Sequence, residues 1–505
     1  MLRRHCCFVL LMLASITAHA TTPAEAAQKL DRFIDEIPGL GPGYAAVVVT
    51  ADEVLLNKVS GVRRASSQAP LTVDTPIYIA SQTKSYVGLL AAILDERGVL
   101  KIDSTLADHW PDLELPGGAE AADYTLSDLL THQVPLDNDF IVNIEAYVTR
   151  IEPADYPRLI QQYGSSRAAG FKYDNLGYNI YSAILETRTG KTWQQWLDDV
   201  VFEPLKLSRT SARTSDFSLQ ELAYSHIWQG DKGWHEVRPK TDGKMQSAGG
   251  IVTSTRDMAR WLQLQLKQAG PRDSGISKRS VDLTHASQVE TGMEDRRNPY
   301  ELACSGYSLG WNLCDFEGHE VFIHGGGYTG NRTMMAFVPS LGIGVAAFSN
   351  SDNQTGWFTS RTVNMYLQFL TDHPNAAKMR QLRIDRYPER VERFLAYRQD
   401  EAKQNQADER WQGWSWRPDA KELAGFTGLW RSGEPYRDLT IHKDQAGLSV
   451  TWGDETARLR PASPGLFAFQ QHPFSEPQSL TFRPGPNDGE FMLEFDDEQF
   501  SRTTR

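Results

Sequence analysis

Ser81 and Lys84 are separated by three positions, a spacing that suits shared proton chemistry. A β-like run over residues 76–79 comes first, and apolar residues then recur at helical spacing up to Leu94, so a helix is expected to begin near Ser81. On a helix, residues three apart lie on one face about one turn apart, so a hydroxyl and an amine can share a proton. The unpaired N–H groups at a helix start also stabilise negative charge. Alone, the pair is also typical of an N-cap serine followed by a solvated lysine.

Two later stretches offer what a lysine-activated serine still needs, a second proton-relaying group and an oxyanion hole. Tyr173 and Asn175 precede a predicted helix and place a phenol and an amide two positions apart. A histidine followed by three glycines ends a predicted strand: His324, Gly325, Gly326 and Gly327. Glycines let a substrate backbone lie close to a strand edge. Each stretch alone is also typical of packing or of a turn.

In this order, Ser-x-x-Lys, Tyr-x-Asn and His-Gly-Gly resemble the three active-site motifs of the serine β-lactamase and penicillin-binding protein superfamily. The closest resemblance is to its class C-like branch of β-lactamases, esterases, D-aminopeptidases and DD-peptidases. The segments Leu-Leu-Thr-His (129–132) and Ala-Gly-Gly-Ile-Val-Thr-Ser-Thr-Arg-Asp-Met-Ala (248–259) resemble flanking segments of the family. The resemblance covers about residues 25–372 and implies an α+β fold, an antiparallel sheet flanked by helices. Residues 421–505 resemble the lipocalin-like β-domain that some members carry.

The resemblance implies a role for each motif residue. Ser81 would be the acylated nucleophile, and Lys84 its general base, kept neutral by burial. Tyr173 would pass a proton to the leaving group, and Asn175 would hold Lys84 and the substrate amide. The backbone N–H groups of Ser81 and Gly327 would form the oxyanion hole.

The chain departs from the family pattern at two places. His324 stands where many relatives have lysine, and histidine carries less positive charge at neutral pH, so recognition of a substrate carboxylate is in doubt. Arg332, expected on the facing strand, would restore that charge or serve as an exposed structural arginine. Residues 133–135 (Gln-Val-Pro) replace the usual Thr-Ser-Gly, which puts the shape of that loop in doubt. For His132, packing and a functional role are both open.

A second serine lies in a rival motif. Residues 306–310, with Ser308 at their centre, match the Gly-x-Ser-x-Gly nucleophile elbow of α/β-hydrolases. That motif requires a strand, a sharp turn and then a helix. Here a strand is predicted to continue, without an alternating β-α pattern around it, so Ser81 is the favoured nucleophile.

Composition and charge limit the possible partners. The chain has 505 residues, 40% of them hydrophobic, and a net charge of −12, which suits a protein of two or three domains and argues against nucleic acid and anionic membrane surfaces as partners. Residues 1–20 combine basic residues, an apolar run and a small-x-small site, which predicts a signal peptide and an exported protein, periplasmic or secreted. No later segment is apolar enough to span a membrane. We expect a small-molecule or short-peptide substrate, and the oligomeric state stays open.

Cys304 and Cys314 are the cysteines beyond residue 20. They can pair in an oxidising compartment, but a continuous strand between them would hold them too far apart, so disulfide and free thiols both stay open. Two cysteines without nearby histidines make a poor zinc site, and no metal-ligand spacing occurs elsewhere. We therefore expect neither a metal nor an organic cofactor.

The elements that must position these residues follow from sequence periodicity. A hairpin over 44–50 and 54–62 is expected to join later strands in one antiparallel sheet covered by helices. Helices are predicted over 23–37, 125–131, 176–200 (two), 254–266 and 357–370, and the later strands over 307–314, 319–324, 333–338 and 343–349. Beyond residue 421, seven short alternating runs predict a small barrel or sandwich.

The sequence thus predicts four segments: a signal peptide (1–20), a β-lactamase-like serine hydrolase domain (21–372), a charged helical linker (373–420) and a β-barrel-like domain (421–505). The expected function is hydrolysis of small peptides, amides or esters through a serine acyl-enzyme. The alternative is a penicillin-binding sensor or peptide-binding protein that acylates slowly or not at all.

Overall fold

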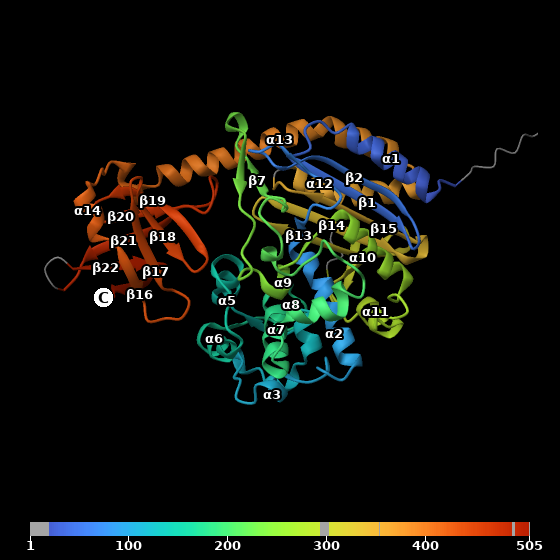
Figure 1. Ribbon diagram of the computed structural model, residues 1–505, viewed down its shortest axis with the longest axis horizontal. Coiled ribbons are helices and arrows are strands. Elements are labelled where there is room, and N and C mark those ends of the chain that lie inside the picture. The colour runs from blue at the N-terminus through green and yellow to red at the C-terminus, as the bar shows by residue number, and fades with distance from the viewer. Residues whose placement is uncertain (1–19, 293–301, 353, 487–489, 504–505) are drawn as a thin grey trace, which may run out of the picture.

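The computed structural model describes residues 20–292, 302–352, 354–486 and 490–503, so most of the predicted signal peptide lies outside the described residues. Its larger body is built on a nine-stranded sheet in the order β10-β11-β12-β13-β14-β15-β1-β2-β3 (Figure 1). The strands are β1 (Gly43–Thr50), β2 (Val54–Arg64), β3 (Ala69–Pro70), β10 (Val289–Glu290), β11 (Ala303–Tyr307), β12 (Asn312–Phe316), β13 (His319–Tyr328), β14 (Asn331–Val338) and β15 (Ile343–Ser349). All pairings are antiparallel, and β1 joins β15, as predicted for the early hairpin.

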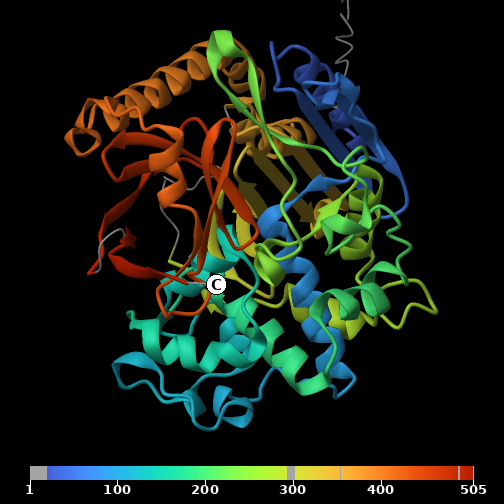
Figure 2. The same ribbon diagram turned by 60° about the vertical axis from the view of Figure 1, so that its left-hand side comes forward.

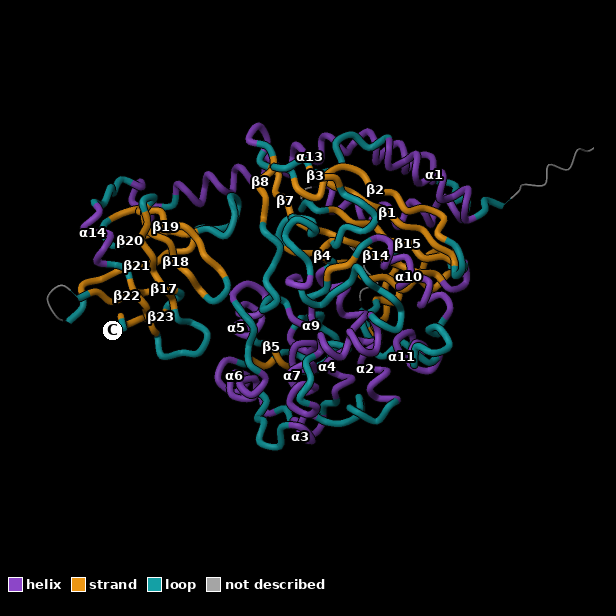
Figure 3. Tube along the Cα trace, in the orientation of Figure 1, coloured by secondary structure: helices purple, strands orange, loops and turns teal. Residues whose placement is uncertain are grey.

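Helices cover both faces of this sheet (Figures 1 and 3). In β1, Ala45, Val47 and Val49 enter one hydrophobic core, whereas Tyr44, Ala46 and Val48 enter the other, as the two-residue period of a strand requires. The helices are α1 (Pro23–Asp35), α2 (Thr83–Glu96), α3 (Leu106–His109), α4 (Leu126–Leu130), α5 (Asp139–Asn143), α6 (Tyr156–Tyr163), α7 (Leu176–Thr189), α8 (Trp193–Leu197), α9 (Gln246–Gly249), α10 (Thr255–Lys267), α11 (Lys278–His285) and α12 (Gln354–Leu370). Helices α1 and α12 pack on the second core, and α2 and α10 on the first.

Helix α2 is the central helix of the first core. Its residues from Thr83 to Leu94 are all buried, which explains why apolar residues occur around most of its circumference. A short helical turn over Ala80–Gln82 precedes it, so the prediction of a helix beginning near Ser81 is confirmed. Three short strand pairs lie outside the main sheet: β4 (Ile77–Tyr78) with β9 (Val252–Thr253), β5 (Leu136–Asp137) with β6 (Ser165–Ser166), and β7 (Ser225–Trp228) with β8 (Trp234–Val237).

The prediction of one continuous strand over 307–314 is wrong. A turn at Ser308–Gly310 folds β11 back onto β12, because Gly310 takes a φ of +88°, which favours glycine. Cys304 therefore lies directly opposite Cys314 in the ladder, and the two form a disulfide. The open question of their pairing is decided by this hairpin.

The smaller body is a closed barrel of eight strands, β16 to β23. They are β16 (Gly428–Arg431), β17 (Leu439–Asp444), β18 (Gly447–Trp452), β19 (Glu455–Ser463), β20 (Leu466–Phe469), β21 (Gln478–Pro484), β22 (Phe491–Phe495) and β23 (Glu498–Arg502). The eighth strand, β23, was not predicted, and it closes the barrel by pairing with β16. Sheet and barrel together confirm the predicted fold class.

A long helix, α13 (Ala376–Ala407), runs from the sheet to the barrel, where α14 (Ala420–Gly425) precedes the first strand (Figure 1). The barrel lies against the helical side of the larger body (Figure 2). The turn between β18 and β19, residues 453–455, makes part of this contact, and we call it the docking turn. Asp454 N donates to Val148 O over 2.9 Å, Thr241 Oγ1 donates to Asp454 Oδ2 over 2.6 Å, and Glu455 forms an ion pair with Lys244.

The predicted domain boundaries stay a prediction. Within the described ranges, no helix is long and apolar enough to cross a membrane.

Candidate active site

The segment that carries Ser81 is held tightly from two sides. Ile79 N donates to Ile251 O over 3.1 Å, and Ile79 O accepts from Thr333 Oγ1 over 3.2 Å. Between them and the serine, buried Ala80 has a φ of +47°, a conformation that is uncommon without glycine and is found at functional sites. The segment therefore leaves Ser81 partly exposed while the three residues after it are buried.

Two glycines allow other parts of the backbone to lie close to the segment around Ser81. A Cβ on Gly326 of β13 would lie 2.0 Å from Ile79 O, and one on Gly310 would lie 2.5 Å from the carbonyl group of Lys84. Any side chain there would collide with the backbone, so the contacts require glycine. The expected end of the strand at His324 is wrong, because β13 continues to Tyr328 and the glycine run lies within it.

Lys84 is fully buried, and its amine makes three contacts. Nζ lies 3.4 Å from Ser81 Oγ and donates to Asn175 Oδ1 and to Ala248 O, both over 2.8 Å. Burial lowers the pKa of Lys84 to about 7, although the nearby Asp174 carboxylate acts in the opposite direction. At neutral pH the amine is thus often unprotonated and can accept the proton of Ser81.

Tyr173 and Asn175 lie at the start of α7, as their tripeptide predicted. The Tyr173 ring centroid lies 4.9 Å from Lys84 Nζ, and the residue is 41% exposed, so a ligand can reach this side chain. Asn175 is the N-cap of α7 and accepts from Lys84. The structure therefore brings the first two motifs together around one amine.

His132 packs its ring against the Tyr173 ring. Its buried ring lies 4.6 Å from the Tyr173 ring, and its Nδ1 accepts from Asp174 N over 3.4 Å. Burial lowers the pKa of His132. Its neutral ring packs under Tyr173, which agrees with the packing alternative.

His324 lies near Tyr173 but carries no charge. Their ring centroids are 6.0 Å apart, and burial, reinforced by Lys84, lowers the pKa of His324 to about 3. Nδ1 is 2.7 Å from Gly325 O, which can only accept, so Nδ1 holds the proton and Nε2 accepts from Tyr307 Oη over 3.3 Å. His324 therefore supplies dipoles and shape to the site.

Arg332 lies on β14, directly opposite Gly327 of β13, as the sequence suggested, but it is not exposed. Its Nη1 donates to Tyr328 O over 3.0 Å and to Asn331 O over 2.9 Å. Burial lowers the pKa of Arg332 from its usual range. The guanidinium therefore fixes the β13–β14 turn.

Ser308, the serine of the rival motif, lies in surroundings unlike those of Ser81. Ser308 is fully buried in the β11–β12 turn, and its hydroxyl donates to Thr284 O over 2.7 Å. A second strand follows it, whereas a nucleophile elbow needs a helix. Ser308 has the contacts of a structural serine.

Sequence reasoning missed a buried polar network behind Lys84. Glu145 is 1% exposed and accepts from Tyr156 Oη and from Asn179 Nδ2. Asn179 Oδ1 in turn accepts from Ala248 N over 3.1 Å, and Ala248 O is the acceptor that holds Lys84. Burial raises the pKa of Glu145 to about 7. Two residues distant in sequence thus position the carbonyl group that orients the amine.

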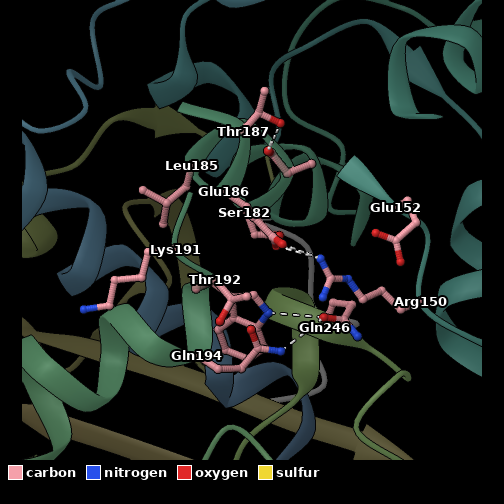
Figure 4. A network of polar contacts seen from close by, with 12 residues as sticks. Arg150, Glu152, Ser182, Leu185, Glu186, Thr187, Lys191, Thr192, Gln194 and Gln246 are labelled. Atoms are coloured by element: carbon pink, nitrogen blue, oxygen red, sulfur yellow. Dashed lines mark hydrogen bonds and ion pairs between the residues drawn. The ribbon is translucent and has the colours of Figure 1, made fainter. Parts of the chain in front are cut away.

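The backbone before Ala248 is also strained and fixed. Met245 and Gln246 have φ values of +64° and +36°. The Gln246 amide donates to two backbone carbonyls and accepts from Trp193 Nε1 over 3.2 Å, while Arg150 pairs with Glu186 on α7 (Figure 4). The contacts of Gln246 hold the turn that leads to Ala248 in a conformation that the chain would otherwise avoid.

Replacing Asn179 with alanine is expected to lower kcat about 10- to 100-fold, because a slightly displaced Ala248 carbonyl misplaces Lys84. It should also lower the free energy of unfolding by about 1–3 kcal/mol, since Ala248 N and Glu145 lose their buried partner. Urea unfolding and steady-state kinetics on one ester check both effects. The exposed Asn143, changed to alanine, is the matched control. An Asn179→Ala enzyme with unchanged kcat would contradict the positioning role.

Comparisons with known proteins agree with this geometry. The family model described as Beta-lactamase matches residues 30–367. The chain is similar to penicillin-binding protein 4 of Amycolatopsis lactamdurans (25% identical; 63% of this chain and 83% of that protein). It is also similar to protein flp of Staphylococcus aureus strain MW2 (23%; 65% and 64%) and to unguisins hydrolase ungD' of Aspergillus campestris (25%; 64% and 60%). The match thus spans less than two thirds of the last two proteins.

Two solved structures share the fold at low sequence identity. An octameric penicillin-binding protein homologue from Pyrococcus abyssi superposes with a TM-score of 0.57 at 19% identity and covers 94% of this chain and 99% of its own. A D-amino acid amidase from Ochrobactrum anthropi SV3 superposes with a TM-score of 0.55 at 18% identity, covering 69% of this chain and 99% of its own.

Proposed function

Because the chain belongs to the beta-lactamase family of serine hydrolases, we propose that it hydrolyses small peptides, amides or esters through an acyl-enzyme at Ser81. The observation that carries this proposal is the buried amine of Lys84, 3.4 Å from Ser81 Oγ and free of any carboxylate within 4.0 Å among the described residues. Burying a lysine without an ionic partner is costly, and the cost is understandable where the neutral amine serves as a base.

In the acylation step, Lys84 takes the hydroxyl proton while Ser81 Oγ attacks the substrate carbonyl carbon. The backbone N–H groups of Ser81 and Gly327 stabilise the oxyanion that develops. Asn175 keeps Lys84 oriented through its 2.8 Å bond. The amine needs no large movement, since the network behind Ala248 already holds it.

Tyr173 then passes the proton from Lys84 to the leaving group. The ring centroid lies 4.9 Å from Nζ, and the residue is exposed. A water molecule subsequently attacks the acyl-enzyme and loses its proton to the same pair, which releases the acid and restores Ser81. No metal or organic cofactor is part of this scheme.

The charges of the site favour substrates without a carboxylate beside the scissile bond over clinically used β-lactams, which carry one. A neutral His324 offers no fixed positive charge to a substrate carboxylate, and Nη1 of Arg332 is used by two backbone carbonyls. The shared fold with a D-amino acid amidase supports testing amides of both hands.

We further propose that residues 1–20 are removed and that the enzyme acts outside the cytoplasm. The Cys304–Cys314 disulfide supports this, because disulfides persist in oxidising compartments. N-terminal sequencing of the protein recovered from the periplasm or medium tests the cleavage, and a mature chain that still begins at Met1 would contradict it.

Labelling with a fluorescent fluorophosphonate or β-lactam, followed over time, tests the proposed activity. Label that forms at Ser81 and then clears, together with turnover of chromogenic esters or aminoacyl anilides, supports a hydrolase. Label that persists without turnover indicates a sensor, and label that never forms indicates a peptide-binding protein. Peptide mapping identifies the labelled residue.

The rate should depend on pH through Lys84. Because the base must be neutral, kcat/KM is expected to rise about tenfold per pH unit below pH 7 and to level off above the pKa of about 7. In an Asp174→Asn variant the midpoint should move to lower pH, since the carboxylate raises the pKa of Lys84. A profile measured from pH 5 to 9 checks both, and an acid limb unmoved by Asp174→Asn would contradict the assignment to Lys84.

A further inference from the structure

A pocket of about 740 Å³ lies beside the active site, between the larger body and the barrel. Residues around β8 and the loop after it form one wall, and the docking turn contributes Asp454 and Glu455 to another. Tyr328 and Thr329, which follow the glycine run of β13, also line it. The pocket therefore begins where the active-site strand ends.

The edge of β13 leads from Ser81 to this pocket. β12 pairs with β13 only as far as Ile323, whereas β14 pairs with it up to Tyr328. Among the described residues, the edge of 324–328 that faces away from β14 therefore has no strand partner. An extended substrate can bind along such an edge through backbone hydrogen bonds.

The acyl part of the substrate is the part that points to the pocket. Tyr173, the proton donor to the leaving group in the proposed mechanism, lies near His324 at the start of this edge. Tyr328 lies at the other end of the edge. A substrate whose leaving group is at Tyr173 therefore extends its acyl part towards Tyr328.

The carboxylates that line the pocket already have protein donors. Glu236 binds Arg64 and Ser66, Asp242 binds Thr214 and Ser215, Asp454 binds Thr241, and Glu455 binds Lys244. Glu236 and Glu455 are thus neutralised by cations, whereas Asp242 and Asp454 are hydrogen-bonded by hydroxyl groups and keep their negative charge.

Lys240 has no ion-pair partner among the described residues, although the Asp242 carboxylate acts on it from a longer distance and, against the effect of burial, raises its pKa. Lys240 lines the pocket, is 8% exposed, and its Nζ donates to the backbone oxygen of Thr241 over 3.2 Å. No carboxylate within the described ranges lies within 4.0 Å of it. Arg238 adds a second cation at the exposed rim, where no described carboxylate pairs with it. Apolar side chains, among them Phe217, Leu222 and Tyr328, complete the lining.

We propose that this pocket is an acyl-side subsite for anionic substrates, in which Lys240 pairs with a carboxylate carried by the acyl group. The proposal rests on the proposed function for its orientation and names the substrate class: amides or esters whose acyl part ends in an acidic group, such as a dicarboxylic acyl chain or an acidic amino acid. Burial lowers the pKa of Lys240 to about 8, so a bound anion would keep it protonated at neutral pH.

Equilibrium binding to the Ser81→Ala protein tests the subsite without turnover. The probes are succinyl-phenylalanine p-nitroanilide and its methyl ester, which has nearly the same shape without the charge, each with D- and L-phenylalanine. In isothermal titration the acid of at least one series should bind about 10- to 100-fold more tightly than its ester, the range for a charge-assisted hydrogen bond.

Adding Lys240→Met should abolish this preference and leave ester binding unchanged. Lys232→Met, which removes an exposed lysine of the β7–β8 turn outside the pocket lining, should preserve it. Equal binding of acid and ester, no binding of the acid at millimolar concentration, or a preference that survives Lys240→Met would overturn the subsite. These binding measurements need no hydrolysis. If the wild-type protein showed no turnover, the proposed function would be wrong, but the binding data would still decide whether the subsite exists.

Discussion

Replacing Ser81 with alanine is expected to reduce the turnover of an ester or anilide by about 10⁴- to 10⁶-fold, the range found when a serine nucleophile is lost. Without Oγ no acyl-enzyme can form, although the oxyanion donors and the bound geometry remain. Initial rates on the best substrate of a chromogenic panel measure the loss. Mass spectrometry should show that the variant no longer gains the mass of a fluorophosphonate adduct.

Ser308→Ala is the matched control for this loss. Its hydroxyl bonds to Thr284 O inside the β11–β12 turn, so the variant should lose about 1 kcal/mol of folding stability and keep most of its turnover. Retained activity in Ser81→Ala, together with lost activity in Ser308→Ala, would sink the assignment of Ser81.

Replacing Lys84 with methionine is expected to lower kcat about 10²- to 10⁴-fold, the contribution of a general base. Methionine has a similar length and no proton to exchange, so it fills the buried site without serving as a base. The acid limb of the pH–rate profile should disappear with the lysine. Rates measured from pH 5 to 9 on the same ester check both effects.

The same substitution should stabilise the fold below about pH 10. The pKa of Lys84 is about 7 in the folded protein and about 10.4 when unfolded, so between these values the unfolded chain binds more protons. The free energy of unfolding therefore rises with pH across that window, by up to about 1.4 kcal/mol per pH unit. Below the window the contribution of Lys84 stays at its lowest value, because the amine is protonated in both states. Lys84→Met removes this dependence.

Urea unfolding of wild type and variant at pH 7 and pH 10 measures the difference. Lys240 and Lys244 also have pKa values lowered to about 8, so the wild-type slope has several sources, and the comparison between the two proteins isolates Lys84. A variant that is less stable than wild type at pH 7, or that keeps the wild-type slope, would show that Lys84 is charged in the folded state.

The sequence predicted that the motif residues around Ser81 come together, because the motifs are short and lie in a recognisable order. Ser81 and Lys84 share a helix start, and Tyr173 and Asn175 share a tripeptide, so each pair needs only local structure. The helix start, the joined hairpin and the barrel could likewise be predicted from local periodicity.

What escaped prediction depends on contacts between distant segments. Glu145 and Asn179 look like ordinary polar residues in sequence, and only the packing of α7 against the loop before Ala248 makes them partners. The Cys304–Cys314 disulfide escaped because Gly306-Tyr-Ser-Leu-Gly310 continues an alternating strand pattern, whereas the positive φ of Gly310 ends it. The last barrel strand, Glu498–Arg502, has a single buried apolar residue, Phe500, and so lacks an alternating pattern.

The docking turn is connected to Lys84 through one short segment of the chain. It binds Thr241 by a hydrogen bond and Lys244 by an ion pair. From there the chain continues through Met245 and Gln246, which have positive φ values, to Ala248, whose carbonyl oxygen accepts from Lys84. Barrel docking and the orientation of Lys84 thus depend on contacts of the same segment. A coupling free energy between barrel docking and substrate binding is the same in both directions, so whatever the docked barrel adds to substrate affinity, a bound substrate returns as strength of docking.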